Sequence, residues 1–298
     1  MGAPLDCVFG ETCFVQQYAD RDPGPGATDH RCTAHSYDGH KGVDFGLPSL
    51  AALEAGVAVL ALAPGVVRAR RDGVSDGAPP REGRECGNGV MLDHADGWST
   101  QYCHMRRGSV RVQKGDVVGA GNVLGQVGLS GETEFPHLHV TVRKDGEVID
   151  PFDGRPLASP CTPGGAGESL WAPGSGVVYT PSGALAAGML DHLPEYRAVK
   201  NTAPTRPELS RDAPAIVFWA HFYGLETGDV ITLRLASPNG EALVENRQVM
   251  TKNRATQFRA AGRKRPAGGW PEGAYRGEAQ LTRAGHVVAE IGATVTVR

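Results

Sequence analysis

Four histidines and one aspartate have the types and spacing expected of a metal-assisted active site. His40 and Asp44 are four residues apart in HKGVD, His104 ends the stretch QYCH, and His137 and His139 alternate in PHLHV. Because alternate side chains of a β-strand point to the same face, a strand here would place the last two histidines together and bury the leucine between them. Two adjacent imidazoles repel each other when both are protonated, whereas a metal ion binds them in the neutral form.

Zinc is the metal that suits such a set of side chains. A catalytic zinc ion takes three protein ligands, often with one carboxylate among them, and keeps a fourth position for water. One aspartate and two histidines supply that set, and two histidines remain for proton transfer. The sequence contains no HExxH motif, which excludes the zinc peptidases that use the glutamate of that motif as a base. Any one of these histidines alone would be read as a solvated side chain, so the prediction depends on their combination.

Short strands separated by glycine-centred turns must position these residues. The stretch GVMLDHADGWSTQYCHM predicts a hairpin that turns at Asp96–Gly97, and VRVQKGDVVGAGNVLGQVG predicts valine-rich strands broken by glycine. Together they indicate a compact, glycine-rich, all-β barrel or sandwich. Further along, alternating stretches such as DVITLRLASPNGEAL predict an immunoglobulin-like β-sandwich.

Four parts of the chain are therefore expected. They are a disulfide-containing N-terminal segment at 1–38, a catalytic domain at 39–160, a Gly/Pro-rich linker at 161–175 and an accessory β-sandwich at 176–298. The N-terminal segment could cover the active site as a flap or support it as a brace. Residues 184–201 could form a helix or a covering loop.

The order of the motifs resembles that of a known family. His40-x-x-x-Asp44, Tyr102-x-His104 and His137-x-His139, with GNGVMLDHADGWSTQYCHM between them, resemble the lysostaphin-type zinc endopeptidases of peptidoglycan over residues 39–151. The resemblance implies one zinc ion per chain, with His40, Asp44 and His139 as its ligands. It also implies that His104 and His137 are catalytic residues that do not bind the metal, without deciding which of them is the general base.

Tyr102 would share the face of His104 if the strand alternates regularly. It is therefore a candidate substrate contact, and a packed hairpin aromatic is an equally good interpretation.

The resemblance implies a zinc metalloendopeptidase that hydrolyses amide bonds in the peptide part of bacterial peptidoglycan. One alternative is a catalytically silent or regulated envelope protein that binds peptidoglycan or activates another hydrolase, although all five motif positions are retained. Another alternative is a zinc protease that acts on extended protein substrates. The sequence leaves open which bond is cut.

All six cysteines lie in the first 161 residues and none belongs to a C-x-x-C pair, which favours disulfides formed in an oxidising compartment. Cys86 precedes the partner strand of Cys103, which should face away from His104, so Cys86–Cys103 is the favoured bridge. Cys7–Cys13 would close a small loop, and Cys32–Cys161 follows by elimination among fifteen possible pairings. The start MGAPLDCVFG has no apolar run, so we expect a mature chain of periplasmic or extracellular location.

Composition limits the partners. With 40% apolar and 21% charged residues the chain is globular, and its net charge of −3 without a basic stripe argues against nucleic acid. No stretch is long and apolar enough to predict a membrane span. Basic residues of the accessory domain form either a solvated loop or a contact to anionic cell-wall polymer or an envelope protein; they are Lys252, Arg254, Arg259, Arg263, Lys264 and Arg265.

Overall fold

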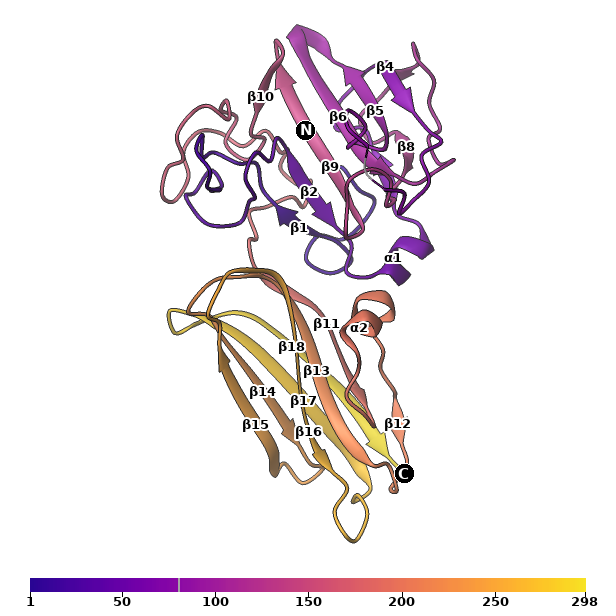
Figure 1. The fold of residues 1–298 in the computed structure, drawn as a ribbon, viewed down its shortest axis with the longest axis vertical. Coiled ribbons are helices and arrows are strands. Elements are labelled where there is room, and N and C mark those ends of the chain that lie inside the picture. The colour runs from indigo at the N-terminus through magenta and orange to yellow at the C-terminus, as the bar shows by residue number, and fades with distance from the viewer. Residues whose placement is uncertain (80) are drawn as a thin grey trace. The chain divides into compact units, whose positions relative to one another are not determined.

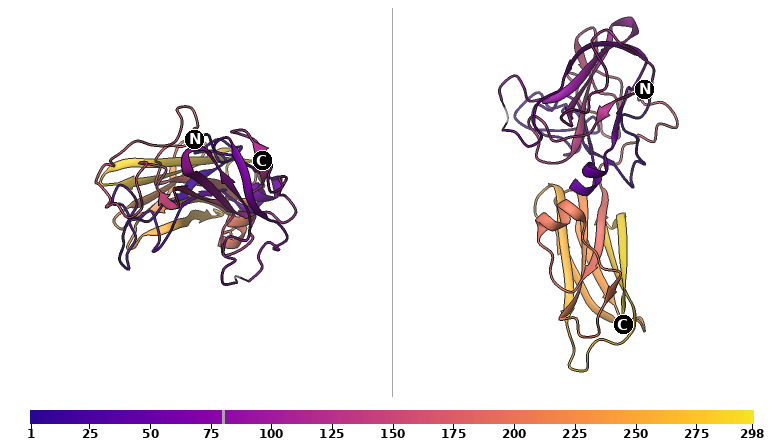
Figure 2. Two further views of the ribbon diagram at one scale, coloured as in Figure 1. Left: turned by 90° about the horizontal axis from the view of Figure 1, so that it is seen from above. Right: turned by 90° about the vertical axis from the view of Figure 1, so that its right-hand side faces the viewer.

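A computed structural model describes residues 1–79 and 81–298. The chain divides into two compact units, Met1–Thr180 and Pro181–Arg298 (Figure 1). Two further views show that strands dominate each unit and that helices are few and short (Figure 2). The predicted all-β class is confirmed.

The first unit is built on one large antiparallel sheet. Its strands follow the order β1-β2-β9-β6-β5-β4-β7, with β10 paired to β9, so that among the described strands the sheet is open, with β1 and β7 at its ends. The bounds are β1 (Phe14–Gln17), β2 (Val43–Gly46), β4 (Gly65–Arg71), β5 (Asn88–Asp93), β6 (Trp98–Met105), β7 (Val117–Val118), β9 (His137–Lys144) and β10 (Glu147–Ile149). A second, two-stranded sheet pairs β3 (Ala58–Leu60) with β8 (Val123–Gln126). The helical elements are α1 (Leu50–Ala55) and the 3-10 turn η1 (Ala95–Gly97).

The core of the first unit includes both ends of its chain segment. Tyr18 and Trp171 are buried in the same hydrophobic cluster as Phe45 and Leu138. The residues that were expected to form an N-terminal segment and a linker therefore belong to this unit, and the division between the units falls after Thr180. All three predicted disulfides are present, namely Cys7–Cys13, Cys32–Cys161 and Cys86–Cys103.

The second unit is a sandwich of two sheets around one core. The first sheet has the order β11-β13-β16, and the second has the order β12-β18-β17-β14-β15. The bounds are β11 (Gly183–Leu190), β12 (Glu208–Leu209), β13 (Ala215–Leu225), β14 (Val230–Ala236), β15 (Ala242–Val249), β16 (Arg254–Lys264), β17 (Gly273–Arg283) and β18 (His286–Val297). Phe218 of one sheet and Leu233 and Leu281 of the other are buried in one cluster. Residues 184–201, for which a helix and a covering loop were both expected as possibilities, contain most of β11 and all but the last residue of the helix α2 (Tyr196–Thr202).

None of the helices described is both long and apolar enough to cross a bilayer.

Candidate active site

Strands β2 and β9 bring the first motif and the last motif together. In their antiparallel register Asp44 lies opposite His139, and Gly46 lies opposite His137. Phe45 lies opposite Leu138, and both of these side chains are fully buried. The two histidines therefore share one face with Asp44 while the residues between them form the core, as strand alternation predicts.

The structure places three potential ligand atoms close together. His40 Nε2 lies 3.1 Å from Asp44 Oδ1 and 3.1 Å from His139 Nδ1. His139 Nδ1 lies 2.9 Å from Asp44 Oδ1. A tetrahedral zinc ion with bonds of about 2.0–2.2 Å separates its ligand atoms by about 3.3 Å, so this donor set fits such an ion.

Neighbouring oxygens determine which nitrogen of each histidine is free. His40 Nδ1 lies 2.7 Å from the carbonyl oxygen of Tyr18, and His139 Nε2 lies 2.9 Å from Thr141 Oγ1. A carbonyl oxygen can only accept a hydrogen bond, so His40 carries its proton on Nδ1 and offers Nε2 to a metal. Donation from His139 Nε2 to the threonine hydroxyl likewise leaves Nδ1 free.

Electrostatics favours the metal-binding protonation state of Asp44 and His139, whereas Asp44 favours protonation of His40 while no cation is bound. Burial alone would raise the pKa of Asp44, but His40 and His137 outweigh it and hold this pKa well below the usual value. Burial lowers the pKa of His139 and outweighs the opposing effect of Asp44. Burial also acts to lower the pKa of His40, yet the adjacent Asp44 carboxylate raises it overall. An ionised aspartate and neutral imidazoles are the forms that bind a divalent cation.

His104 and His137 lie beside these three residues with their rings 4.7 Å apart. His104 Nδ1 lies 2.9 Å from the Ser130 carbonyl oxygen, and His137 Nδ1 lies 2.8 Å from that of Phe135. Each therefore carries its proton on Nδ1 and has an unprotonated Nε2. Burial lowers the pKa of His104 to about 3, which keeps this imidazole neutral.

This part of the chain matches a known family. Residues 38–151 match peptidase family M23. The resemblance noted in the sequence is thereby confirmed over the matched range, which we call the M23 segment.

Curated relatives match part of the chain. The DD-carboxypeptidases/endopeptidases Mpg of Neisseria meningitidis and Neisseria gonorrhoeae are 34% identical over 119 residues, which is 39% of this chain and 23% of each relative. Stage II sporulation protein Q of Bacillus subtilis is 38% identical over 74 residues, which is 24% of this chain and 25% of the relative. The chain thus spans about a quarter of the length of these curated relatives.

Solved structures of M23 proteins are also similar. The catalytic domain of the prophage-encoded M23 protein EnpA from Enterococcus faecalis is 26% identical, with 50% of this chain and 93% of that chain covered and a TM-score of 0.33. The catalytic domain of lysostaphin from Staphylococcus simulans is 25% identical, with 45% and 85% covered and a TM-score of 0.30.

The structure favours one of the two interpretations of Tyr102, the packed aromatic, and contradicts the expectation for Cys103. Tyr102 is fully buried, and its hydroxyl oxygen accepts hydrogen bonds from the Leu62 amide at 2.9 Å and from Thr100 Oγ1 at 3.1 Å. Tyr102 is therefore a core residue and not a substrate contact. Cys103 was expected to face away from the site, but it lies directly opposite His139 in the β6–β9 pair. The reason is the left-handed φ of 63° at His104, which ends the regular alternation of β6.

Tyr37 is a residue of this site that the sequence did not identify. Its ring stacks on that of His40, with centroids 4.2 Å apart and planes inclined by 22°, and it remains 50% exposed. Burial of its hydroxyl and the nearby carboxylates of Asp44 and Glu132 raise its pKa. An aromatic residue three positions before His40 follows no ligand spacing rule, so only the folded chain reveals this contact.

Proposed function

We propose that this chain is a zinc-dependent endopeptidase that hydrolyses amide bonds in the peptide part of bacterial peptidoglycan. One observation carries the proposal: three donor atoms 2.9–3.1 Å apart lie beside two histidines whose Nδ1 atoms face carbonyl oxygens, with His137 Nε2 3.6 Å from Asp44 Oδ1. The match of this region to a peptidase family supports the reaction class. The relatives from Neisseria are named DD-carboxypeptidase/endopeptidase Mpg, which supports a peptidoglycan peptide as the substrate.

His40 Nε2, Asp44 Oδ1 and His139 Nδ1 would hold the zinc ion. When bound, zinc lowers the pKa of a coordinated water toward about 7 and polarises the scissile carbonyl. The Nε2 atom of His104 or His137 would accept the proton of the attacking water, since the Nδ1 atom of each faces a carbonyl oxygen. The histidine that has gained this proton then carries Nε2–H, which can donate a hydrogen bond to the developing oxyanion and pass the proton to the departing amine.

A periplasmic or extracellular location of the mature chain is part of this proposal. Three disulfides within the first unit support it, because such bonds persist in oxidising compartments. We also propose that the second unit contacts anionic polymer or an envelope protein through the basic residues of β16.

The decisive experiment is digestion of purified peptidoglycan by the zinc-loaded chain, with His137→Ala as the control and mass spectrometry of the products. New amide-cleaved muropeptides that are absent from the control would support the proposal and identify the bond. Intact peptidoglycan, despite one bound zinc ion per chain, would contradict it. That result would favour a catalytically silent envelope protein that binds peptidoglycan. If the chain then cleaved an extended protein, it would favour a zinc protease that acts on protein substrates.

A further inference from the structure

The Cys86–Cys103 disulfide is attached to the backbone of a predicted catalytic histidine. Cys103 directly precedes His104, and the Cys86 carbonyl oxygen accepts a hydrogen bond of 2.9 Å from the His104 amide. The disulfide and this hydrogen bond thus join the same two short segments. They hold His104 in a left-handed conformation that residues other than glycine rarely adopt.

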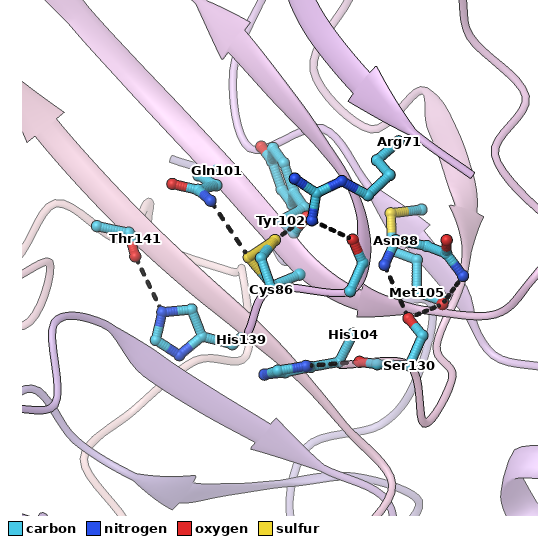
Figure 3. Close-up of a disulfide and its surroundings, with 12 residues drawn as sticks. Arg71, Cys86, Asn88, Gln101, Tyr102, His104, Met105, Ser130, His139 and Thr141 are labelled. Carbon is cyan, nitrogen blue, oxygen red and sulfur yellow. Dashed lines mark hydrogen bonds between the residues drawn. A yellow bond between two sulfur atoms is a disulfide. The ribbon is translucent and has the colours of Figure 1, made fainter. Parts of the chain in front are cut away.

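The residues that follow Cys86 also position the imidazole ring of His104, through Ser130. The Asn88 amide donates to Ser130 Oγ at 2.9 Å, and Ser130 Oγ donates to the Met105 carbonyl oxygen at 2.7 Å (Figure 3). Ser130 in turn supplies the carbonyl oxygen that accepts from His104 Nδ1. Gly87 packs against this serine so closely that an added Cβ would lie 2.3 Å from the Ser130 carbonyl carbon. Backbone and ring of His104 are therefore fixed by one segment, which the disulfide ties to β6.

The other two disulfides have no such connection. Within the described part of the chain, the hydrogen bonds of His104 run to Cys86, Gly128 and Ser130, and none involves Cys7, Cys13, Cys32 or Cys161. The metal-binding atoms are held by β2, β9 and the Tyr18 carbonyl oxygen. Cys103 lies opposite His139, but β2 holds the other side of His139 through its pairing with Asp44. Loss of the Cys86–Cys103 bond should therefore displace His104 without removing the metal site.

We propose that Cys86 and Cys103 are positioning residues for His104, so that hydrolysis by the proposed peptidase depends on their oxidation. The inference rests on the proposed function, because it concerns the rate of that reaction. An added dithiol breaks the S–S bond: the two cysteines gain two electrons and two protons as thiols, and the dithiol becomes a disulfide. Cys86 is only partly buried, which leaves this bond open to such exchange.

The test compares Cys86→Ser/Cys103→Ser with the matched control Cys7→Ser/Cys13→Ser. We expect kcat on peptidoglycan peptides to fall by about tenfold or more in the first variant, since small misplacements of a catalytic group are costly. KM and the zinc content should stay close to those of the wild type, and the control should keep its kcat. An unchanged kcat, or an equal fall in the control, would overturn the proposal.

A reductant titration of the wild type covers the case in which the double variant does not fold. Alkylation and mass spectrometry measure the released thiols while kcat is followed in the same samples. Activity should fall in proportion to Cys86 alkylation and return on reoxidation. Activity that instead follows alkylation of Cys7 or Cys161 would exclude the positioning role.

Hydrogen exchange provides a readout that needs no activity. The His104 amide, which donates to Cys86, should exchange about tenfold faster or more after loss of the disulfide, whereas the Asp20 amide, which donates to His40, should not change. If the oxidised wild type fails to cleave peptidoglycan, the proposed function fails, and the exchange rates still decide whether the disulfide positions His104. Equal exchange at His104 in both forms would refute the inference.

Discussion

At the scale of single residues, the candidate site depends on which atom of each side chain is left free. Tyr18, Ser130 and Phe135 all present carbonyl oxygens to Nδ1 atoms, and a carbonyl oxygen can only be paired by a protonated nitrogen. The unprotonated nitrogen of His40, His104 and His137 is therefore Nε2. Of these three residues, His40 is a proposed zinc ligand. The two histidines of the HxH motif consequently have different expected roles although they share one face.

Substitution of these two histidines should separate metal binding from catalysis. His139→Ala removes a proposed ligand, so we expect zinc content well below one per chain and no hydrolysis. His137→Ala should keep its zinc while kcat falls by about a hundredfold or more, as is typical on loss of an acid–base group. Metal analysis and peptidoglycan digestion of both variants check this. Full zinc occupancy in His139→Ala would contradict the assigned ligand set.

Tyr102→Phe tests the assignment of this tyrosine to the core. The Leu62 amide would lose its acceptor in a fully buried place, and such a loss costs about 1–3 kcal/mol. We expect a lower free energy of unfolding by this amount and an unchanged KM, measured by denaturant unfolding and by kinetics. A raised KM with unchanged stability would instead restore Tyr102 as a substrate contact.

At the scale of elements, the site depends on how closely β2 and its preceding turn approach β9. Gly42, within HKGVD, lies where an added Cβ would be 2.3 Å from the Val140 carbonyl oxygen and 2.7 Å from His139 Nε2. The glycine is therefore required by the contact between two strands and not by its own backbone angles. Sequence spacing alone shows a glycine between the two ligands, but not the strand that it touches.

Gly42→Ala should therefore disturb the metal centre through the backbone. We expect zinc affinity to fall by about ten- to a hundredfold, in the range seen when the surroundings of ligands are altered. Gly119→Ala is the matched control, because its Cβ would meet nothing closer than 3.6 Å. Competition with a zinc chelator measures both variants. Equal affinities in the two variants would show that the close approach at Gly42 is unimportant.

At the scale of the whole molecule, the first unit is closed by contacts between the ends of its chain segment. Arg21 Nη1 and Asp153 Oδ1 form a buried ion pair at 3.0 Å, and Cys32 is bonded to Cys161. Trp171 is 7% exposed within the same core. The early residues and residues 161–180 are thus structural parts of the unit that carries the candidate site.

Fragments of different length test this boundary. The fragment 1–180 should fold, bind zinc and hydrolyse peptidoglycan peptides, because it contains the complete first core. The fragment 1–160 lacks Cys161 and Trp171, and we expect it to aggregate or to unfold at a lower temperature. Circular dichroism and zinc content of the two fragments decide this. Equal stability would show that residues 161–180 are only a linker.

The second unit contains a buried histidine that should make its stability depend on pH. His221 is fully buried, neither ring nitrogen has a hydrogen-bond partner among the described residues, and burial together with Lys200 lowers its pKa to about 4. In the unfolded chain His221 is protonated below its ordinary pKa of about 6.5, whereas in the folded unit it stays neutral down to about pH 4. The free energy of unfolding therefore decreases as the pH falls from 6.5 toward 4. The loss should reach about 3 kcal/mol.

Calorimetry of the full chain between pH 7 and pH 4 measures this effect. The transition of the second unit should move to lower temperature in the wild type and move less in His221→Leu. The same replacement at the exposed His286 should leave the wild-type pH dependence unchanged. An equal pH dependence in wild type and His221→Leu would contradict the assignment.

The sequence alone predicted the chemistry-bearing residues, the common face of the HxH pair and the all-β class. These follow from the period of two in a strand and from motif order, which are local properties of the chain. The three disulfides were the favoured pairing among fifteen, and the folded chain brings those cysteines together. Only the tertiary structure decided that Tyr102 is core, that Cys103 lies on the site face, and that Tyr18 and Tyr37 contact His40. Which face of a strand becomes core depends on the elements that pack against it. The left-handed residue His104 also ends the regular alternation of β6, on which the prediction for Tyr102 and Cys103 was based. Contacts such as Tyr18 with His40, or Ser130 with His104, join distant segments, so no spacing rule contains them.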